Sequence, residues 1–423
     1  MPEIPWKEPP NHVLADDLIV GLDIGTTKVC AVIGDMHESG SINVIGVGHA
    51  ATGDGVKKGT IVDIEKVTQA IMDAVEEAEK VADVVIERVY VGIAGSHINS
   101  LNSQGIVAIK GTGNEITAED VDRAVENAKT AISIPHHQEI IHILPREFVV
   151  DEQKEISNPI GMVGSRLEAQ VHIVTGAVTA MQNIIKCCQT ARLKVEDVVL
   201  QPYASSMSVL SEDEKKLGVV LIDIGGGTTD LIIFQNGHVV HSYSAPVGGQ
   251  YVTNDIAVGL KTSTAAAENL KIKYGVAFNT FIDPSCKMQV PVAGSDRMRE
   301  CTQKDLAEII EPRMEEIFNE MKEQISRQVS LDMIPAGVVL TGGSSLMMGC
   351  PELAEESLGL PVRRGFPITV TGLKERVQNP MFATSVGLIR YGAQHFQASP
   401  PEPGVLGGVV DRLRAVFRRF FSD

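Results

Sequence analysis

Two stretches of the chain repeat one order of apolar and polar positions. In residues 18–35 and again in 217–237, an apolar run ends in Asp-Ile-Gly, a turn of Gly and Thr follows, and a second apolar run resumes. Residues 42–50 and 238–248 add a third apolar run to each copy. Short apolar runs bounded by glycine are typical of buried strands. The repetition therefore predicts a duplicated domain.

A helical pattern follows the third run in both copies. The second copy has it in residues 254–275, and the first in 62–82. Two β-β-β-α halves predict an α/β fold with a cleft between the halves. The apolar positions of 62–82 that share one helix face are Val67, Ile71, Ala74, Val75 and Ala78.

The residues between the two copies follow a different pattern of apolar and polar positions. Strand-like runs surround one helical stretch, and Thr117 and Asp120 have the spacing of an N-terminal capping pair for it. This pattern predicts a small α+β insert. Further on, residues 302–328 predict a long helix with a bend at Pro312, and the prolines of 395–404 predict a stiff linker.

These patterns divide the chain into expected segments. They are a flexible N-terminus at 1–17; a first core subdomain at 18–87 and 167–214; the insert at 88–166; a second core subdomain at 215–253 and 330–393; a smaller subdomain at 254–329; a linker at 394–403; and an amphipathic helix at 404–423.

The composition narrows the class of protein. The 423 residues carry 37 Lys and Arg against 54 Asp and Glu, and a net charge of −17 argues against nucleic acid as a partner. No run of apolar residues is long enough to predict a membrane-spanning helix. The N-terminus lacks the basic and apolar parts of a secretory signal, so we expect a cytoplasmic protein. The six cysteines show no spacing typical of a disulfide framework or a zinc site.

The two Asp-Ile-Gly turns carry residue types that bind phosphate. Glycines let backbone N–H groups converge on an anion, and threonine hydroxyls add donors. An Asp at the end of a strand can hold the water ligands of Mg²⁺. One such turn alone is better explained as an ordinary β-turn, but two copies in matching strand contexts favour a phosphate site. The candidates are Asp23, Gly25, Thr26, Thr27 and Lys28 in the first turn, and Asp223, Gly225, Gly226, Gly227, Thr228 and Thr229 in the second.

A third turn carries a weaker signal. Gly342, Gly343 and Ser344 follow an apolar strand-like run, and adjacent glycines would let the flat rings of an adenosine lie against the backbone. Glu268 and Lys271 have i,i+3 spacing on a predicted helix and could reach a ribose or base. An exposed ion pair within the helix explains this pair equally simply.

Together these motifs resemble a known superfamily. Two Asp-x-Gly-Thr hairpins followed by a Thr-Gly-Gly turn resemble the actin-like ATPases. More closely, GLDIGTTKVCAVIG, LIDIGGGTTDLIIF, VVLTGGSSLMMG and the amphipathic end of the chain resemble FtsA, a family of bacterial cell division proteins. The resemblance extends from about residue 18 to 421. It also covers the insert, since FtsA carries its distinctive small subdomain at this place.

The resemblance implies roles for the candidates. The two turns would hold the phosphates of ATP, Asp23 and Asp223 would serve Mg²⁺ through water, and the third turn would lie by the adenosine with Glu268 and Lys271 as contacts. Gln201 loosely matches the place of a residue that orients the attacking water. Because an amide is a poor base, at most slow hydrolysis is expected.

The histidines of residues 136–142 predict no metal site. His136, His137 and His142 lack Cys or acidic partners at metal-site spacing, and we expect them at the surface or an interface of the insert.

The last residues predict a helix for a lipid surface. On a helix, the apolar side chains of 406–421 fall on one side, and arginines supply most of the polar face. Packing on the body of the protein is the alternative. Arginines opposite phenylalanines, after a proline linker, favour a membrane interface, and the resemblance implies the same. One such helix would bind reversibly, and self-assembly would strengthen binding. The expected contacts are Leu406, Val409, Val410, Arg412, Leu413, Arg414, Val416, Phe417, Arg418, Arg419, Phe420 and Phe421.

The expected function follows from the resemblance. It implies an ATP-binding protein on the cytoplasmic face of the inner membrane at the division site. There it would self-associate, tether filaments of the tubulin-like FtsZ, bind anionic lipids and recruit later division proteins. A small-molecule kinase of the same superfamily is the alternative, and would need a carboxylate base facing its substrate. A chaperone-type ATPase is disfavoured because no sizeable substrate-binding domain follows the core.

Overall fold

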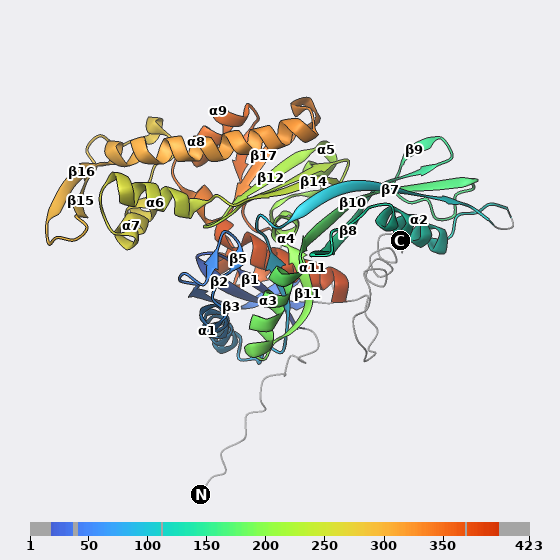
Figure 1. Ribbon diagram of the computed structural model, residues 1–423, viewed down its shortest axis with the longest axis horizontal. Helices are drawn as coiled ribbons and strands as arrows, with labels where there is room; N and C mark the ends of the chain where they lie inside the picture. The colour runs from blue at the N-terminus through green and yellow to red at the C-terminus, as the bar shows by residue number, and fades with distance from the viewer. Residues whose placement is uncertain (1–17, 37–40, 111–112, 369, 397–423) are drawn as a thin grey trace, which may run out of the picture.

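The computed structural model describes residues 18–36, 41–110, 113–368 and 370–396. In this part of the chain, two large sheets form the two halves, and a third sheet forms the insert beside them (Figure 1). The predicted α/β fold with two related halves is confirmed. The predicted N-terminal segment 1–17, most of the linker and the amphipathic helix 404–423 lie outside the described residues.

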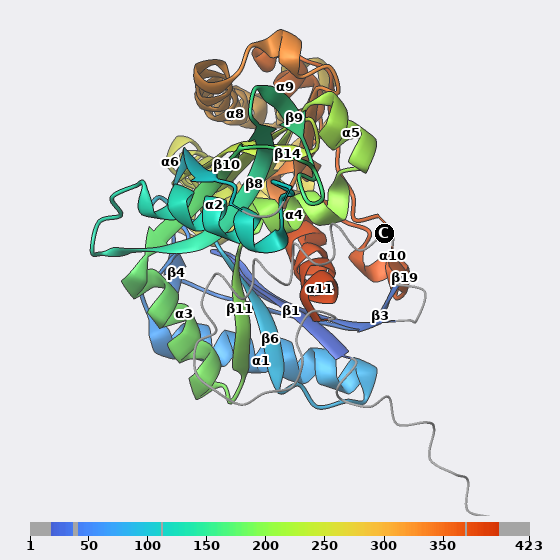
Figure 2. The same cartoon turned by 90° about the vertical axis from the view of Figure 1, so that its right-hand side faces the viewer.

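The first half is a six-stranded sheet in the order β11-β6-β1-β2-β3-β19. β1, β2 and β3 form the predicted antiparallel meander, and β6 lies parallel to β1 and β11. Leu22 packs among residues of α1, whereas Ile19 packs among residues of α11, so helices cover both faces (Figure 2). The bounds are β1 Leu18–Ile24, β2 Lys28–Met36, β3 Ile42–Ala51, α1 Ile64–Ala82, β6 Arg88–Ile93, α3 Val178–Thr190, β11 Lys194–Leu200, β19 Val370–Gly372, α10 Lys374–Val377 and α11 Ala383–Phe396.

The second half repeats the meander. Its sheet has the order β14-β13-β12-β17-β18, with β17 parallel to β12. The bounds are α4 Gln201–Val209, α5 Glu212–Leu217, β12 Val219–Ile224, β13 Thr229–Gln235, β14 His238–Ala245, α6 Gly249–Gly259, α7 Thr264–Tyr274, β15 Lys287–Pro291, β16 Met298–Thr302, α8 Gln303–Gln328, β17 Val338–Thr341, α9 Cys350–Leu358 and β18 Val362–Arg364.

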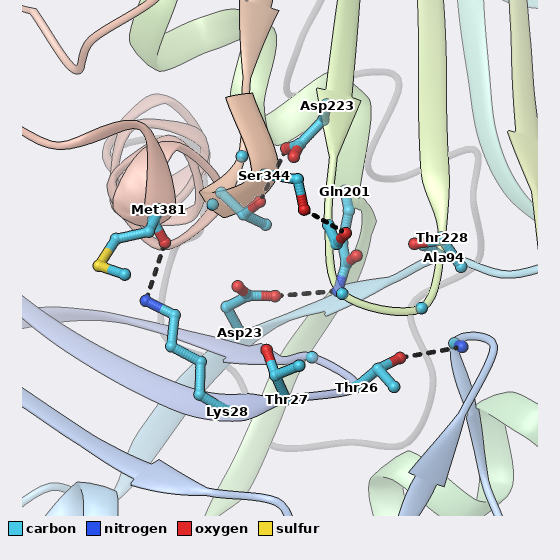
Figure 3. Close-up of a pocket in the computed structure, with 18 of the residues that line it drawn as sticks. Asp23, Thr26, Thr27, Lys28, Ala94, Gln201, Asp223, Thr228, Ser344 and Met381 are labelled. Carbon is cyan, nitrogen blue, oxygen red and sulfur yellow. Dashed lines mark hydrogen bonds between the residues drawn. The ribbon is translucent and has the colours of Figure 1, made fainter. Parts of the chain in front are cut away.

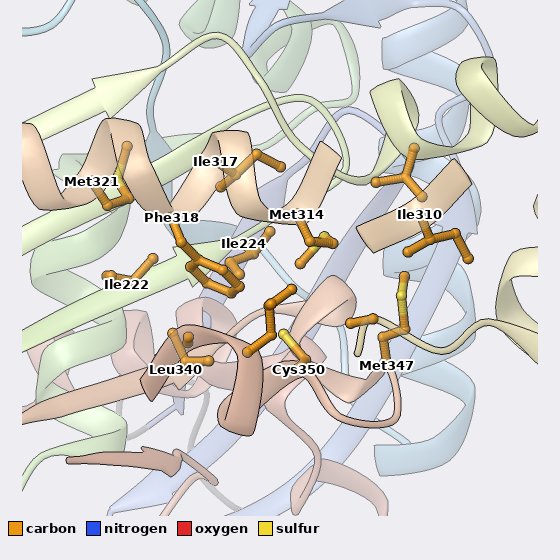
Figure 4. Close-up of a cluster of buried hydrophobic side chains, with 14 of the residues drawn as sticks. Ile222, Ile224, Ile310, Met314, Ile317, Phe318, Met321, Leu340, Met347 and Cys350 are labelled. Atoms are coloured by element: carbon orange, nitrogen blue, oxygen red, sulfur yellow. The ribbon is translucent and has the colours of Figure 1, made fainter. Parts of the chain in front are cut away.

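The long helix α8 covers one face of this second sheet. Met314, Ile317 and Phe318 of α8 are fully buried against Ile222 of β12 and Leu340 of β17 (Figure 4). Pro312 lies inside the helix, which continues past it as a single element. The core under α8 extends to α6 and to β15, so the expected smaller subdomain at 254–329 shares its core with the second sheet.

The helix expected over 254–275 is two helices. α6 ends at Gly259, Lys261 takes a left-handed backbone conformation, and the Ser263 hydroxyl accepts from the Ala266 N–H to cap α7. A left-handed residue and a serine cap interrupt a helix even where the apolar pattern continues.

The insert sheet has the order β7-β10-β8-β9. α2 packs on it and begins with the capping pair that the sequence predicts, because the Thr117 side chain accepts from the Asp120 N–H and Asp120 accepts from the Thr117 N–H. The bounds are β7 Asn99–Ala108, α2 Ala118–Thr130, β8 Gln138–Val150, β9 Gln153–Ile156 and β10 Arg166–Ala177; the short β4 Val56–Lys57 and β5 Thr60–Ile61 pair with each other.

Strand pairing differs from the expected insert boundary of 88–166 at both ends. β6 lies inside that range but pairs with β1 and β11 in the first-half sheet. β10 lies almost wholly beyond it but is a central strand of the insert sheet. Strand-like runs look alike in sequence, and only pairing between distant segments assigns them to a sheet.

α11 packs very closely on its neighbours through glycine. A Cβ on Gly387 would overlap the Ala204 backbone of α4, and a Cβ on Gly21 of β1 would lie 2.5 Å from the Ser385 carbonyl oxygen. The backbones of α4, α11 and β1 are therefore in direct contact, with no side chains between them at these points.

Candidate functional site

A cavity of about 610 Å³ lies between the two halves, where the β1–β2 and β12–β13 turns meet (Figure 3). The structure brings together every predicted nucleotide-site residue but one. Those that line the cavity are Asp23, Gly25, Thr26, Thr27, Lys28, Gln201, Asp223, Gly225, Gly226, Gly227, Thr228, Glu268, Lys271, Gly342, Gly343 and Ser344.

The two turns meet face to face. A Cβ on Gly226 would overlap the side chain of Thr27, and a Cβ on Gly227 would overlap that of Thr26. The threonines of the first turn therefore occupy the space that the glycines of the second turn leave free. This close approach requires glycine at both positions.

Lys28 anchors the first turn at the bottom of the cavity. Its ammonium donates to the Met381 carbonyl over 3.0 Å and lies 4.2 Å from the centre of the Phe382 ring (Figure 3). Both partners are uncharged, so the positive charge remains available to an anion in the cavity.

Asp23 and Asp223 stand at matching strand ends on either side of the cavity. Burial raises the pKa of Asp23 to about 7; the positive charge of Lys28 opposes this rise, and the negative charge of Asp223 adds to it. Burial also raises the pKa of Asp223, against hydrogen bonds from Ser205 and Thr384. Neighbouring buried carboxylates of this kind accept a cation readily.

Gln201 begins α4 and reaches into the same space. Its Nε2 donates to Asp23 Oδ1 over 2.9 Å (Figure 3), and its side chain packs against Gly92. The amide therefore has a fixed orientation beside the acidic residue.

Asp223 is held from two helices that the sequence did not connect with it. The Ser205 hydroxyl of α4 donates to its Oδ2 over 2.8 Å, and Thr384, at the start of α11, lies 3.4 Å from the same oxygen. No local motif marks these two residues, because the contact joins segments far apart in the chain.

The third turn closes the cavity behind the second one. Gly342 takes a left-handed backbone conformation with φ of 83°, and a Cβ there would lie 2.5 Å from the Ile224 carbonyl oxygen. The Ser344 hydroxyl donates to the Gly225 carbonyl over 3.2 Å. The third turn is therefore tied directly to the second.

Glu268 and Lys271 form the predicted i,i+3 ion pair over 2.8 Å. The pair is not simply exposed, because only 11% of the Lys271 side chain is accessible. The ammonium also donates to the Gly249 carbonyl (3.0 Å) and the Thr253 hydroxyl (2.8 Å), and that hydroxyl donates to Glu268. Both residues line the cavity in fixed positions.

Thr229 is the predicted contact that the cavity excludes. It is the first residue of β13, is fully buried, and donates its hydroxyl to the Val247 carbonyl over 2.8 Å. Its side chain therefore does not line the cavity, and its contact with the nucleotide stays a prediction.

Asp230, which sequence analysis did not select, lines the cavity instead. It is 3% exposed, its Oδ2 accepts from the Thr228 hydroxyl over 2.9 Å, and within the described residues its Oδ1 has no hydrogen-bond partner. Burial raises the pKa of this carboxyl to about 7. An acidic residue inside the otherwise apolar run TDLIIF was the signal that could have identified it.

The histidines of the insert have different positions. His136 and His137 are exposed, whereas His142 is buried and its Nε2 accepts from the Leu200 N–H over 2.9 Å, at the interface with the first half. Within the part of the chain that the structure describes, no group of three or more His, Cys, Asp or Glu side chains could hold a metal ion.

Comparisons with known proteins agree with this architecture. Residues 220–387 match the family model of cell division protein FtsA, and 95–175 match that of the SHS2 domain inserted in FtsA. The cell division protein FtsA of Pseudomonas aeruginosa is 46% identical over 383 residues, which cover 90% of this chain and 91% of that protein. The chain belongs to the FtsA family. The FtsA of Neisseria meningitidis is 44% identical over 402 residues, covering 93% of this chain and 96% of that protein.

Solved structures of more distant proteins share the fold of this FtsA-family chain. A PilM–PilN complex of type IV pilus biogenesis matches with a TM-score of 0.65 and 18% identity, covering 89% of this chain and 98% of that one. MreB5 of Spiroplasma citri bound to ADP matches with a TM-score of 0.54 and 12% identity, covering 88% and 95%. Among the described helices of the FtsA-family chain, none has the length and apolar character to cross a bilayer.

Proposed function

We propose that the cavity of this FtsA-family protein binds ATP together with Mg²⁺. The observation that carries the proposal is the convergence of two glycine turns and the Lys28 ammonium on a single cavity between the halves. Backbone N–H groups of such turns suit phosphate oxygens, and Lys28 adds a positive charge. MreB5, which shares the fold, has been solved with ADP.

The acidic residues fit the metal that accompanies ATP. Asp23 and Asp223 both line the cavity, and the negative charge of Asp223 contributes to the raised pKa of Asp23. Their carboxylates would hold Mg²⁺ through its water ligands. When bound, ATP with Mg²⁺ supplies the phosphoanhydride bond. Gln201 can orient a water molecule beside it but cannot remove a proton, so turnover would be slow.

The adenosine would lie toward the third turn. Gly342 and Gly343 both line the cavity, and Gly343 is exposed. Glu268 and Lys271 present fixed polar groups from α7. A ribose offers hydroxyls that such a pair can bind.

The wider role of the protein rests on family membership and on the pattern of its last residues. As a division protein, it would self-associate, anchor FtsZ filaments and recruit later division proteins at the cytoplasmic face of the inner membrane. The arginines and phenylalanines of 404–423 would bind anionic lipid reversibly, and assembly would multiply the number of bound helices.

Two measurements test these proposals. A fluorescent ATP analogue should bind the full chain with Mg²⁺, and excess ATP should displace it. The full chain should sediment with vesicles of anionic lipid, and more strongly with ATP, while a chain ending at Pro403 should stay in solution. Equal sedimentation of the two chains would contradict membrane attachment through 404–423 without affecting the nucleotide site.

Asp230 gives the kinase alternative one specific point of support, because it is a buried carboxylate residue that lines the cavity and, among the described residues, its Oδ1 has no hydrogen-bond partner. A kinase would transfer phosphate from ATP to a small hydroxyl compound, and deletion of 404–423 would leave that rate unchanged. Release of inorganic phosphate alone, at a slow rate, would contradict the kinase.

A further inference from the structure

Two short segments of the first half lie together at one end of the nucleotide cavity. One is the tip of the β4–β5 hairpin, Lys58 and Gly59, and the other is Gly95, between β6 and β7. A Cβ on Gly59 would lie 2.9 Å from the Cα of Gly95, so the two backbones are in direct contact. Gly59 and Ala94 line the cavity. We call Lys58, Gly59 and Gly95 the strap.

The strap is tied to the first glycine turn. The Gly59 N–H donates to the Thr26 hydroxyl over 3.4 Å (Figure 3). Thr26 in turn packs against the second turn, because a Cβ on Gly227 would lie 2.2 Å from Thr26 Oγ1. The strap therefore lies at the end of the cavity where the two turns meet and would hold the phosphates.

The strap also contacts the second half at a buried point. The Gly95 N–H donates to the Ser244 hydroxyl of β14 over 3.0 Å. A buried backbone N–H without an acceptor costs free energy, so this bond favours contact between the strap and β14. Separation of the two would expose the N–H of Gly95 to water.

A second contact with the second half lies nearer the surface. The Lys58 ammonium lies 5.5 Å from the centre of the Tyr251 ring of α6, within the range of a cation–π contact. Tyr251 is a fixed partner. The guanidinium of Arg313 from α8 lies 5.6 Å from the centre of the same ring and donates twice to Asp255 of α6, over 2.6 and 3.2 Å. The ring is therefore held by the second half, whereas Lys58 belongs to the first.

These contacts oppose the movement that release of a nucleotide needs. Because the two glycine turns belong to different halves, a nucleotide held by both can leave only when the halves part between them. An exposed cation–π contact and one neutral hydrogen bond each contribute a modest free energy. The strap can therefore separate from the second half and return without unfolding of the protein.

We propose that the strap is a gate that sets the rate at which nucleotide enters and leaves the cavity, held shut by its contacts with Ser244 and Tyr251. This inference rests on the proposed binding of ATP in the same cavity. The lining of the cavity includes neither Lys58 nor Tyr251, so their contact would not touch the nucleotide. Loosening it opens the empty and the occupied cavity alike. Both rates then rise together, and the affinity stays the same.

The first test measures the association and dissociation rate constants of a fluorescent ATP analogue with Mg²⁺, by stopped flow on the full chain. Lys58→Met removes the charge and keeps the length of the side chain. The matched reference is Lys57→Met, because Lys57 is the exposed neighbour and loses the same surface charge. Relative to this reference, Lys58→Met should raise both rate constants by about threefold, as expected for an exposed cation–π contact.

The partner of Lys58 gives the internal controls. Tyr251→Leu should raise both rate constants to a similar extent, and the double variant with Lys58→Met should be no faster than either single variant. Tyr251→Phe keeps the ring and should retain the rates of the wild type. Faster dissociation with unchanged association would make Lys58 a direct contact of the nucleotide and overturn the gate. Equal rates in Lys58→Met and Lys57→Met would overturn the gate and leave the proposed ATP site intact.

A second measurement does not depend on nucleotide. Hydrogen exchange of the Gly95 amide in the full chain reports separation of the strap from Ser244. Lys58→Met should exchange this amide about threefold faster than Lys57→Met. If the chain does not bind the analogue, the proposed ATP site fails, and faster exchange still supports a strap that opens. Equal exchange in the two variants would overturn the gate.

Discussion

The two glycine turns have the same length and are closed by the same backbone hydrogen bond, but they carry different side chains. The Gly25 N–H donates to the Lys28 carbonyl over 2.9 Å, and the Gly225 N–H donates to the Thr228 carbonyl over 3.0 Å. Lys28 and Thr228 are therefore structural counterparts, although the shared Thr-Thr letters of the sequence suggest another alignment. The first turn carries Thr, Thr and Lys where the second carries Gly, Gly and Thr.

The two turns are complementary in what they contribute to the cavity. The first turn supplies side chains and a positive charge, and the second supplies space and backbone. Two positions beyond the closing residues Lys28 and Thr228, the neutral Cys30 of β2 pairs with Asp23, whereas the acidic Asp230 of β13 pairs with Asp223. The glycines of the second turn are therefore explained by the threonines of the first turn, which pack against them.

Replacing Gly342 should lower stability more than any other change proposed below, because the third turn packs directly against the second turn. Gly342→Ala puts a Cβ 2.5 Å from the Ile224 carbonyl oxygen at a φ of 83°. The free energy of unfolding should fall by about 3 kcal/mol. Urea denaturation measures it. Gly343→Ala is the control, because no atom lies within 4 Å of its Cβ. Similar losses in both variants would contradict the steric argument.

The second largest effect should come from removing the positive charge of Lys28, and it should appear in the affinity for ATP. Lys28→Met should weaken binding of ATP by about thirtyfold, as expected for a charge-assisted contact of about 2 kcal/mol. Its counterpart Thr228→Val loses a neutral hydroxyl, whose proton goes to Asp230 and whose oxygen lone pairs suit a metal-bound water, and should weaken binding by about fivefold. Titration with a fluorescent ATP analogue in the presence of Mg²⁺ measures both. The asymmetry between the turns is refuted if the threonine variant loses as much affinity as the lysine variant.

The fit between the turns should appear as an energetic coupling. Gly227→Ala should lower the free energy of unfolding by about 2 kcal/mol, because the new methyl group meets Thr26. In the double variant with Thr26→Ala, part of this loss should be recovered, with a coupling of about 1 kcal/mol or more. Urea denaturation of the wild type, the two single variants and the double variant measures this coupling energy. Simple additivity would show that the two turns do not share the space.

Asp230, which follows the second turn in β13, should give the smallest effect: a dependence of the free energy of unfolding on pH. Asp230 keeps its proton to a pKa of about 7 in the folded state, against 3.8 as the ordinary value. Its contribution to stability is therefore full below pH 4 and is lost as pH rises to 7, by about 1 kcal/mol per pH unit. Asp230→Asn should reduce the slope in this range but not remove it, because the pKa of Asp23 is also raised to about 7. The free energy of unfolding is measured against pH without nucleotide and with a chelator.

The control for this slope is the structural counterpart. Cys30 does not titrate in that range, because burial raises its pKa to about 11. Cys30→Ala should shift the whole profile without changing its slope. A slope as steep in Asp230→Asn as in the wild type would show that Asp230 does not contribute to it.

Local patterns were sufficient to predict much of this fold. The two meanders, the buried face of α1 and the Thr117 cap depend on neighbours within one element, and all are present. The same holds for most of the candidate site, because Gly, Thr and Asp cluster within each turn. The meeting of the turns followed from their duplication.

What the sequence did not reveal depends on register and on distant contacts. Thr229 and Asp230 are adjacent, and strand alternation alone decides which of them faces the cavity. The Ser205 and Thr384 contacts to Asp223 and the pairing of β6 and β10 join segments far apart in the chain. β8 has a bulge at Arg146, between the paired Pro145 and Glu147, and the apolar pattern does not reveal it because a bulge exists only where two strands pair.

α11 connects the cavity with the end of the described chain. Its first turn holds Asp223 through Thr384, and Gly387 brings its backbone directly against α4. The helix has 14 residues and so is about 21 Å long. Direct backbone contact leaves no compressible layer to absorb a shift at one end. We therefore expect a change in the position of Asp223 to move α11 as a rigid body. The described chain ends at Phe396, the last residue of this helix.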